Sequence, residues 1–119
     1  MSEAGQAAVV VADDDPALRL LCRVNLELEG YRVFEAGSGD ELERVIAAES
    51  VDAVLLDIRL GADDGVELAG RLRERHPDLG IAFLSGSLDR TERGPAEGFL
   101  AKPFTLEALA ETVRRLVRR

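Results

Sequence analysis

Five short apolar runs alternate with segments of helical character along the 119 residues, and this alternation constrains the fold more than any other feature. The runs span residues 7–12, 31–36, 53–57, 80–85 and 99–101. Strands that alternate with helices in one small chain form a parallel sheet with helices on both faces. We therefore predict an α/β fold with a doubly wound, five-stranded parallel sheet, right-handed crossovers and the flavodoxin-like strand order 2-1-3-4-5.

The first helical segment carries clear start and stop signals. Pro16 suits the first turn of a helix over 17–29, and Gly30 is a typical residue to end it. Its periodicity predicts an inner face that Asn25 interrupts and that is formed by Leu18, Leu21, Cys22 and Leu28.

Three further helices are expected. Ser38 and Glu41 match a capping box at the start of a helix that runs to about residue 49. A helix over 65–76 ends before Pro77, and Thr105 can cap a last helix.

The connection over 86–98 lacks an amphipathic pattern. Leu88 is its only large apolar residue between the end glycines, and Gly94-Pro95 would break a helix. We therefore expect mostly loop or a single helical turn, so that the fourth helix of the fold is short or absent.

Composition excludes several classes of protein. Apolar residues make up 46% of the chain, which is enough for a core and argues against global disorder. The net charge of −8 argues against direct nucleic-acid binding, which needs clustered lysines and arginines. The single cysteine, Cys22, cannot form an internal disulfide.

The chain also lacks targeting and membrane signals. No apolar stretch is long enough to cross a membrane, and residues 1–8 do not have the pattern of a signal peptide. We therefore expect a cytoplasmic protein without membrane insertion. One domain should cover 1–119, with residues 1–6 disordered.

Chemistry-bearing residues stand where the predicted strands end. Asp13-Asp14-Asp15 follow the first strand, Asp57 ends the third, Ser85 ends the fourth, and Lys102 follows the fifth. Because the carboxyl ends of parallel strands meet at one edge of a sheet, we expect these side chains to gather there. Neighbouring carboxylates repel each other and favour a cation, and Mg²⁺ is bound by oxygen ligands. An oxygen nucleophile, an ammonium group and a hydroxyl beside such an ion are what phosphoryl transfer requires.

Four motifs occur at these strand ends in a fixed order: Asp13-Asp14, Asp57 with Asp64-Gly65, Ser85-Gly86, and Lys102-Pro103-Phe104. Each motif is weak alone, but together they resemble the receiver domain of two-component response regulators over essentially the whole chain. The sequence Phe-Leu-Ser-Gly over 83–86, with the short connection after it, is similar to receivers of hybrid histidine kinases and of stand-alone relay regulators.

The resemblance implies roles for the matching residues. Asp57 would be the phosphoacceptor, and Ser85 and Lys102 would hold phosphoryl oxygens. Ser85 and Phe99 would form the conformational switch. The peptide bond before Pro103 is commonly cis in this family.

The resemblance also implies a site for Mg²⁺ or another divalent cation such as Mn²⁺. Asp14 would be the main ligand, joined by Asp57 and the backbone carbonyl of Arg59. Asp13 would support the ion through a water molecule.

These expectations describe the phosphoacceptor of a two-component phosphorelay. A phosphoryl group would pass to Asp57 from a phosphohistidine on a sensor histidine kinase or a histidine phosphotransfer domain, and would change contacts with a downstream protein. His76 falls at the opposite edge of the sheet and is not expected to be the donor. At most, such a chain catalyses its own phosphorylation and dephosphorylation, without turnover of a separate small-molecule substrate.

Three alternatives differ from this interpretation. A pseudo-receiver would keep the fold as an interaction module without phosphorylation. A haloacid-dehalogenase-like phosphatase needs an acid at the position of Arg59, which argues against it. A flavodoxin-like FMN-binding protein is disfavoured because Asp13-Asp14-Asp15 would repel a phosphate.

Overall fold

The computed structural model describes residues 6–86 and 96–118. The strands in this part of the chain are β1 (Ala8–Ala12), β2 (Arg32–Ala36), β3 (Ala53–Asp57), β4 (Arg59–Leu60), β5 (Asp63–Asp64), β6 (Gly80–Ser85) and β7 (Gly98–Ala101). The helices are α1 (Pro16–Leu28), α2 (Gly39–Ala48), α3 (Gly65–Arg75) and α4 (Leu106–Val117).

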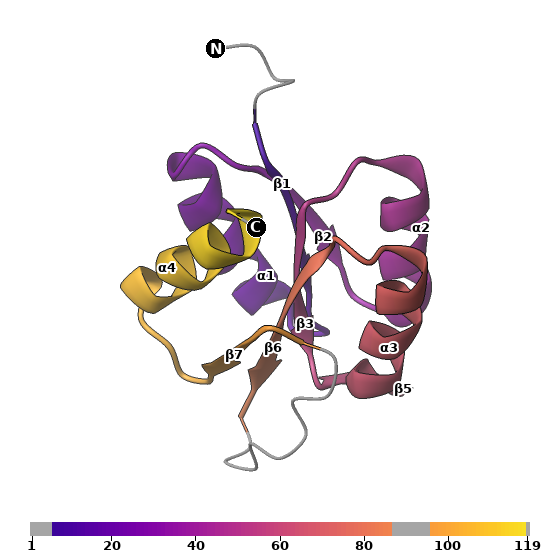
Figure 1. Cartoon of the computed structure of the whole chain (residues 1–119). Helices are drawn as coiled ribbons and strands as arrows, with labels where there is room; N and C mark the ends of the chain where they lie inside the picture. Colours follow the sequence, from indigo (N-terminus) through magenta and orange to yellow (C-terminus); the bar gives the residue numbers. More distant parts are fainter. Residues whose placement is uncertain (1–5, 87–95, 119) are drawn as a thin grey trace.

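The main sheet has the order β2-β1-β3-β6-β7, with every neighbouring pair parallel. Its last two strands are the fourth and fifth of the predicted sheet, so the predicted fold class and strand order are confirmed. Helices α1 and α4 cover one face, and α2 and α3 cover the other (Figure 1). Because both faces are covered, β1 and β6 are buried along their whole length and show continuous apolar runs rather than alternation.

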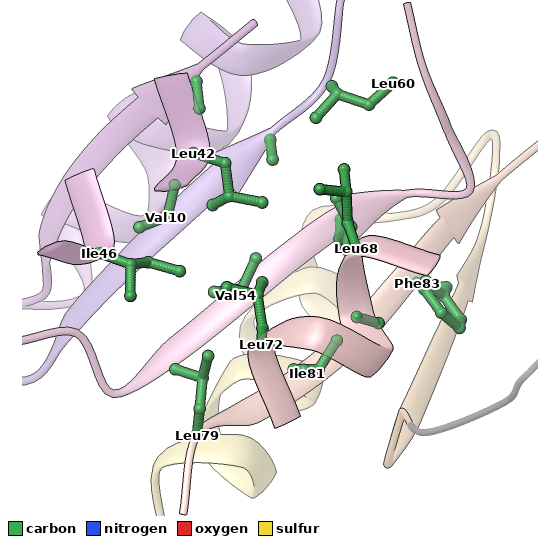
Figure 2. Close-up of a cluster of buried hydrophobic side chains, with 14 of the residues drawn as sticks. Val10, Leu42, Ile46, Val54, Leu60, Leu68, Leu72, Leu79, Ile81 and Phe83 are labelled. Carbon is green, nitrogen blue, oxygen red and sulfur yellow. The ribbon is translucent and has the colours of Figure 1, made fainter. Parts of the chain in front are cut away.

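The core lies in two layers, one on each side of the sheet. Figure 2 shows the layer beneath α2 and α3, where Leu42, Leu68 and Leu72 pack against Val54 and Phe83 of the sheet. The layer beneath α1 and α4 contains Val9, Val11, Cys22, Leu26, Leu55, Leu84, Leu109 and Val113, among other residues.

The predicted inner face of α1 was partly wrong. Leu21 and Leu28 are 47% and 80% exposed, whereas the fully buried residues of this helix are Cys22 and Leu26. Apolar side chains occupy more than half of the helix circumference, so the pattern alone did not fix which part faces the sheet. Asn25 is accommodated beside this face because its side-chain amide donates to the carbonyl of Leu21 at 2.8 Å.

Most helix boundaries follow the predicted signals. Gly30 has a φ of +98°, the left-handed conformation expected after a helix. The Ser38 hydroxyl accepts a hydrogen bond from the Glu41 N–H at 3.2 Å, as in a capping box. However, the Glu41 carboxylate binds the N–H of Gly37 rather than that of Ser38. Thr105 caps α4 through the N–H of Ala108.

The prediction did not include the β4–β5 hairpin that follows β3. Arg59 pairs with Asp64 and Leu60 with Asp63 across an antiparallel turn. The carboxylate of Asp63 accepts a hydrogen bond from the N–H of Gly39 at 2.9 Å, which ties the hairpin to the start of α2.

The expectation of a short or absent fourth helix falls mainly on residues 87–95, which lie outside the described residues. Within the described ranges, no helix has the length and apolar character needed to cross a membrane.

Candidate functional site

The first part of the site is the loop between β1 and α1. Asp13 is fully buried, and its backbone N–H donates to the carbonyl of Ala36 at 3.0 Å. Its Oδ1 accepts a hydrogen bond from the N–H of Asp15 at 2.9 Å. Asp15 is the N-cap of α1, and Asp14 between them is exposed at the sheet edge. The three predicted aspartates therefore differ in role: one is buried, one is exposed, and one caps a helix.

The second part is the end of β3. Asp57 is half-buried, and its Oδ1 accepts a hydrogen bond from the N–H of Arg59 at 2.9 Å. The chain returns through the β4–β5 hairpin, and the N–H of Gly65 donates to the carbonyl of Ile58 at 2.6 Å. A Cβ at position 65 would lie only 2.2 Å from the Asp57 carbonyl oxygen, so this position requires glycine.

Lys102 joins these two parts of the site. Its Nζ lies 2.6 Å from Oδ2 of Asp13 and 3.0 Å from Oδ2 of Asp57. Its backbone N–H donates to the carbonyl of Ser85 at 2.8 Å, and the peptide bond that follows, to Pro103, is cis. The sequence predicted that Lys102 lies at the same sheet edge as Asp13 and Asp57, and the structure places its ammonium group in contact with both carboxylates.

The protonation of Asp57 and Lys102 reflects both burial and their contact. Burial raises the pKa of Asp57, and this outweighs the Arg59 hydrogen bond and the Lys102 ammonium, which lower it. Burial alone would lower the pKa of Lys102. The hydrogen bonds to Asp13 and Asp57 have the opposite effect and outweigh burial, so the pKa of Lys102 is raised. Lys102 is therefore a fixed positive charge at neutral pH.

The carboxylates could hold a divalent cation. Oxygen atoms of Asp13, Asp14 and Asp57 lie within 4.8 Å of one another. The donors are hard oxygen atoms, Asp14 is open to solvent, and one or two carboxylates are typical for a Mg²⁺ site, so the residues fit such an ion. The role of the Arg59 carbonyl as a ligand stays a prediction.

The two predicted switch residues flank the site. Ser85 is buried at the end of β6, next to the strand that carries Asp57. Phe99 lies on the edge strand β7, where it pairs with Phe83 and is partly buried against the α2–α3 layer of the core. Their positions are those expected from the sequence, while their roles remain predictions.

Arg19 also contacts this site, and the sequence analysis did not single it out. Its guanidinium donates to the backbone carbonyl of Asp13 at 2.6 Å. A contact between an arginine and a main-chain oxygen leaves no signature in residue spacing.

Comparisons with known proteins agree with this geometry. The family model described as the response regulator receiver domain matches residues 9–114. The response regulator MprA of Mycolicibacterium vanbaalenii is 38% identical over 116 residues, which cover 93% of this chain and 50% of MprA. The C4-dicarboxylate transport transcriptional regulatory protein DctD of Pseudomonas aeruginosa is 36% identical over 92% of this chain and 25% of its own length.

Solved structures show the same fold. The receiver domain of NtrX from Brucella abortus is 28% identical with a TM-score of 0.86, and the match covers 93% of this chain and 98% of that one. The response regulator TrrA from Thermotoga maritima, solved in complex with Mg(2+)-BeF, is 29% identical with a TM-score of 0.85, covering 93% and 99%. The chain spans about half the length of MprA and a quarter of DctD. The family model covers most of the chain, and the fold and the acidic sheet edge agree with it. The chain therefore belongs to the response regulator receiver domain family.

Proposed function

We propose that this receiver domain accepts a phosphoryl group on Asp57 from a phosphohistidine of a sensor histidine kinase or a histidine phosphotransfer domain. The observation that carries the proposal is the contact of Lys102 with both Asp13 and Asp57, within a cluster that also includes Asp14. A lysine held between two carboxylates beside a solvent-open acid suits acyl phosphate formation, because the ammonium can pass from Asp57 to a phosphoryl oxygen.

The transfer is a displacement at phosphorus. An Oδ of Asp57 forms the new O–P bond, the P–N bond to the donor imidazole breaks, and its electron pair leaves with that imidazole. Lys102, now bound to Oδ2 of Asp57 at 3.0 Å, would then donate to a phosphoryl oxygen. Hydrolysis by water would later return Asp57 to the free carboxylate.

Asp14 and Asp57 would hold Mg²⁺, or Mn²⁺ in its place, with the Arg59 carbonyl as a further ligand and with Asp13 acting through a water molecule. When bound, the ion supplies positive charge that offsets these acids and the incoming phosphoryl oxygens. The Mg(2+)-BeF complex of TrrA supports this assignment, because that protein is 29% identical over 93% of this chain.

Phosphorylation would be read by a partner protein. The added charge of about −1.5 to −2 would draw Ser85 and Lys102 toward the phosphoryl group, and Phe99 would transmit the change along β7. Residues 1–119 would act as one receiver unit. Longer relatives such as MprA and DctD show that such a unit can be part of a larger regulator.

The test is incubation with acetyl phosphate and Mg²⁺, followed by intact mass spectrometry. We expect one added phosphoryl group, absent in Asp57→Asn and in EDTA. Asp40→Asn, an exposed acid on α2, is the matched control and should be phosphorylated like the wild type. If neither acetyl phosphate nor a phosphorylated histidine phosphotransfer domain labels the protein, the pseudo-receiver alternative is correct.

A further inference from the structure

A row of charged side chains runs along α1 and ends at the acidic loop. The guanidinium of Arg19 donates to the carbonyl of Asp13 at 2.6 Å and to Oε1 of Glu35 at 3.1 Å. Arg23 donates to the other oxygen of Glu35 at 3.3 Å and to Glu27 at 3.2 Å. Glu35 on β2 therefore holds two arginines of α1, one on each carboxylate oxygen.

Arg19 and Glu35 are the better-shielded pair in this row. Their side chains are 18% and 24% exposed, compared with 46% for Arg23. A Cβ at Gly37 would lie 3.1 Å from Nη1 of Arg19, so the glycine leaves room for the guanidinium. Arg19 is thus confined between α1, the end of β2 and the acidic loop.

The contact with Asp13 has a direct geometric consequence. The carbonyl of Asp13 belongs to the peptide bond whose nitrogen is that of Asp14, so a hydrogen bond to this oxygen fixes the peptide plane from which Asp14 extends. The other polar groups of Asp13 are occupied by Ala36, Asp15 and Lys102. Arg19 is the contact that orients the link between the buried acid and the exposed one.

We propose that Arg19, held by Glu35, is a positioning residue that sets the affinity of the acidic loop for a divalent cation. This inference rests on the proposed function, because it assumes that Asp13 and Asp14 bind the ion. Arg19 carries a positive charge, which alone would weaken cation binding. However, Glu35 offsets that charge, so the orientation of the Asp13–Asp14 peptide should dominate.

The test is titration with Mn²⁺, followed by the electron paramagnetic resonance signal of the free ion. Arg19→Ala should weaken Mn²⁺ binding about tenfold, at the lower end of what the loss of an outer-shell hydrogen bond costs. Arg19→Lys, which keeps one donor for the carbonyl, should recover part of the affinity. Glu35→Gln should also weaken binding, because it releases the guanidinium and leaves its charge unbalanced.

Arg23→Ala is the matched control. This variant removes the second arginine that binds Glu35, and the guanidinium of Arg23 donates to Glu35 rather than to the Asp13 carbonyl. Because exposed ion pairs contribute little, the Mn²⁺ affinity of Arg23→Ala should stay within about twofold of the wild type. Urea unfolding of each variant confirms that the folded protein is titrated; if Arg19→Ala does not fold, Arg19→Lys and Glu35→Gln decide the question.

The outcomes separate the two proposals. If the wild type binds Mn²⁺ and Arg19→Ala binds it equally well or more tightly, Arg19 has no positioning role, and the proposed function is unaffected. A wild-type protein that binds no Mn²⁺ would refute both.

Discussion

The replacement Gly65→Ala tests how closely the backbone packs beneath Asp57. The added Cβ would stand 2.2 Å from the Asp57 carbonyl oxygen and 2.8 Å from that of Ile58. Ordinary contact begins at 3.4 Å, so the two segments must separate by about 1 Å. The atoms that must move are main-chain atoms, which have no rotamer through which to escape.

The expected cost follows from these contacts. Overpacking costs about 1–3 kcal/mol, and loss of the hydrogen bond from Gly65 to the Ile58 carbonyl adds about 1 kcal/mol. The gain from alanine over glycine in a helix offsets about 0.5–1 kcal/mol of this. Gly65→Ala should therefore lower the free energy of unfolding by about 1–3.5 kcal/mol, a substantial share of the 5–15 kcal/mol that is typical of a domain.

The same displacement should impair the chemistry. A shift of about 1 Å at a reacting group can slow a reaction about 100-fold, so phosphorylation of Asp57 by acetyl phosphate should slow by up to that factor. Because the chain has no tryptophan, unfolding in urea is followed by circular dichroism, and phosphorylation is followed by intact mass.

Gly70→Ala is the matched control. It lies in the same helix, but a Cβ there would have no neighbour within 4 Å, so the change should stabilise the fold by about 0.5–1 kcal/mol. If Gly65→Ala unfolds at the same urea concentration as the wild type, or if both variants shift the unfolding midpoint alike, the main chain at Gly65 does not pack closely against Asp57.

Three further predictions concern stability. Burial raises the pKa of Asp57 above its ordinary 3.8, so folding favours the protonated form and wild-type stability is lost as pH rises through the folded pKa. Asp57→Asn should therefore be more stable than the wild type at pH 7, and in urea melts the difference should shrink as pH falls through the folded pKa and vanish below about pH 4. Leu26→Ala should cost about 2–5 kcal/mol and Leu28→Ala less than about 0.5 kcal/mol, and equal losses would contradict the observed face of α1. Arg73→Ala should cost roughly 1–3 kcal/mol in the same assay, because Arg73 pairs with Glu97 and donates to two carbonyls of the α3–β6 connection.

The sheet and its acidic edge could be predicted because their signals are local. Strands buried on both faces appear as continuous apolar runs, as in Ala53–Asp57, and parallel strands bring their carboxyl ends to one edge. The positions of Asp13, Asp57 and Lys102 then follow from topology, and the structure brings all three into contact.

Features that depend on the exact placement of neighbouring elements could not be predicted. Apolar residues cover more of the surface of α1 than the part that packs against the sheet, so the sequence pattern does not determine which of them are buried. The prediction therefore included Leu21, which is exposed, and omitted Leu26, which is buried. The β4–β5 hairpin has two-residue strands, too short for a pattern of alternation. The contact of Arg19 with the Asp13 carbonyl depends on the approach of α1 to the sheet edge, which periodicity does not specify.

The most direct test of the central claim locates the phosphoryl group. The protein is phosphorylated with acetyl phosphate and Mg²⁺, and borohydride then reduces the acyl phosphate to an alcohol that marks the modified residue in peptide mass spectra. Residue 57 alone should be converted to homoserine, and EDTA or Asp57→Asn should abolish the mark. Conversion at Asp13 or Asp14 instead, or a phosphoryl group that persists in Asp57→Asn, would contradict the central claim.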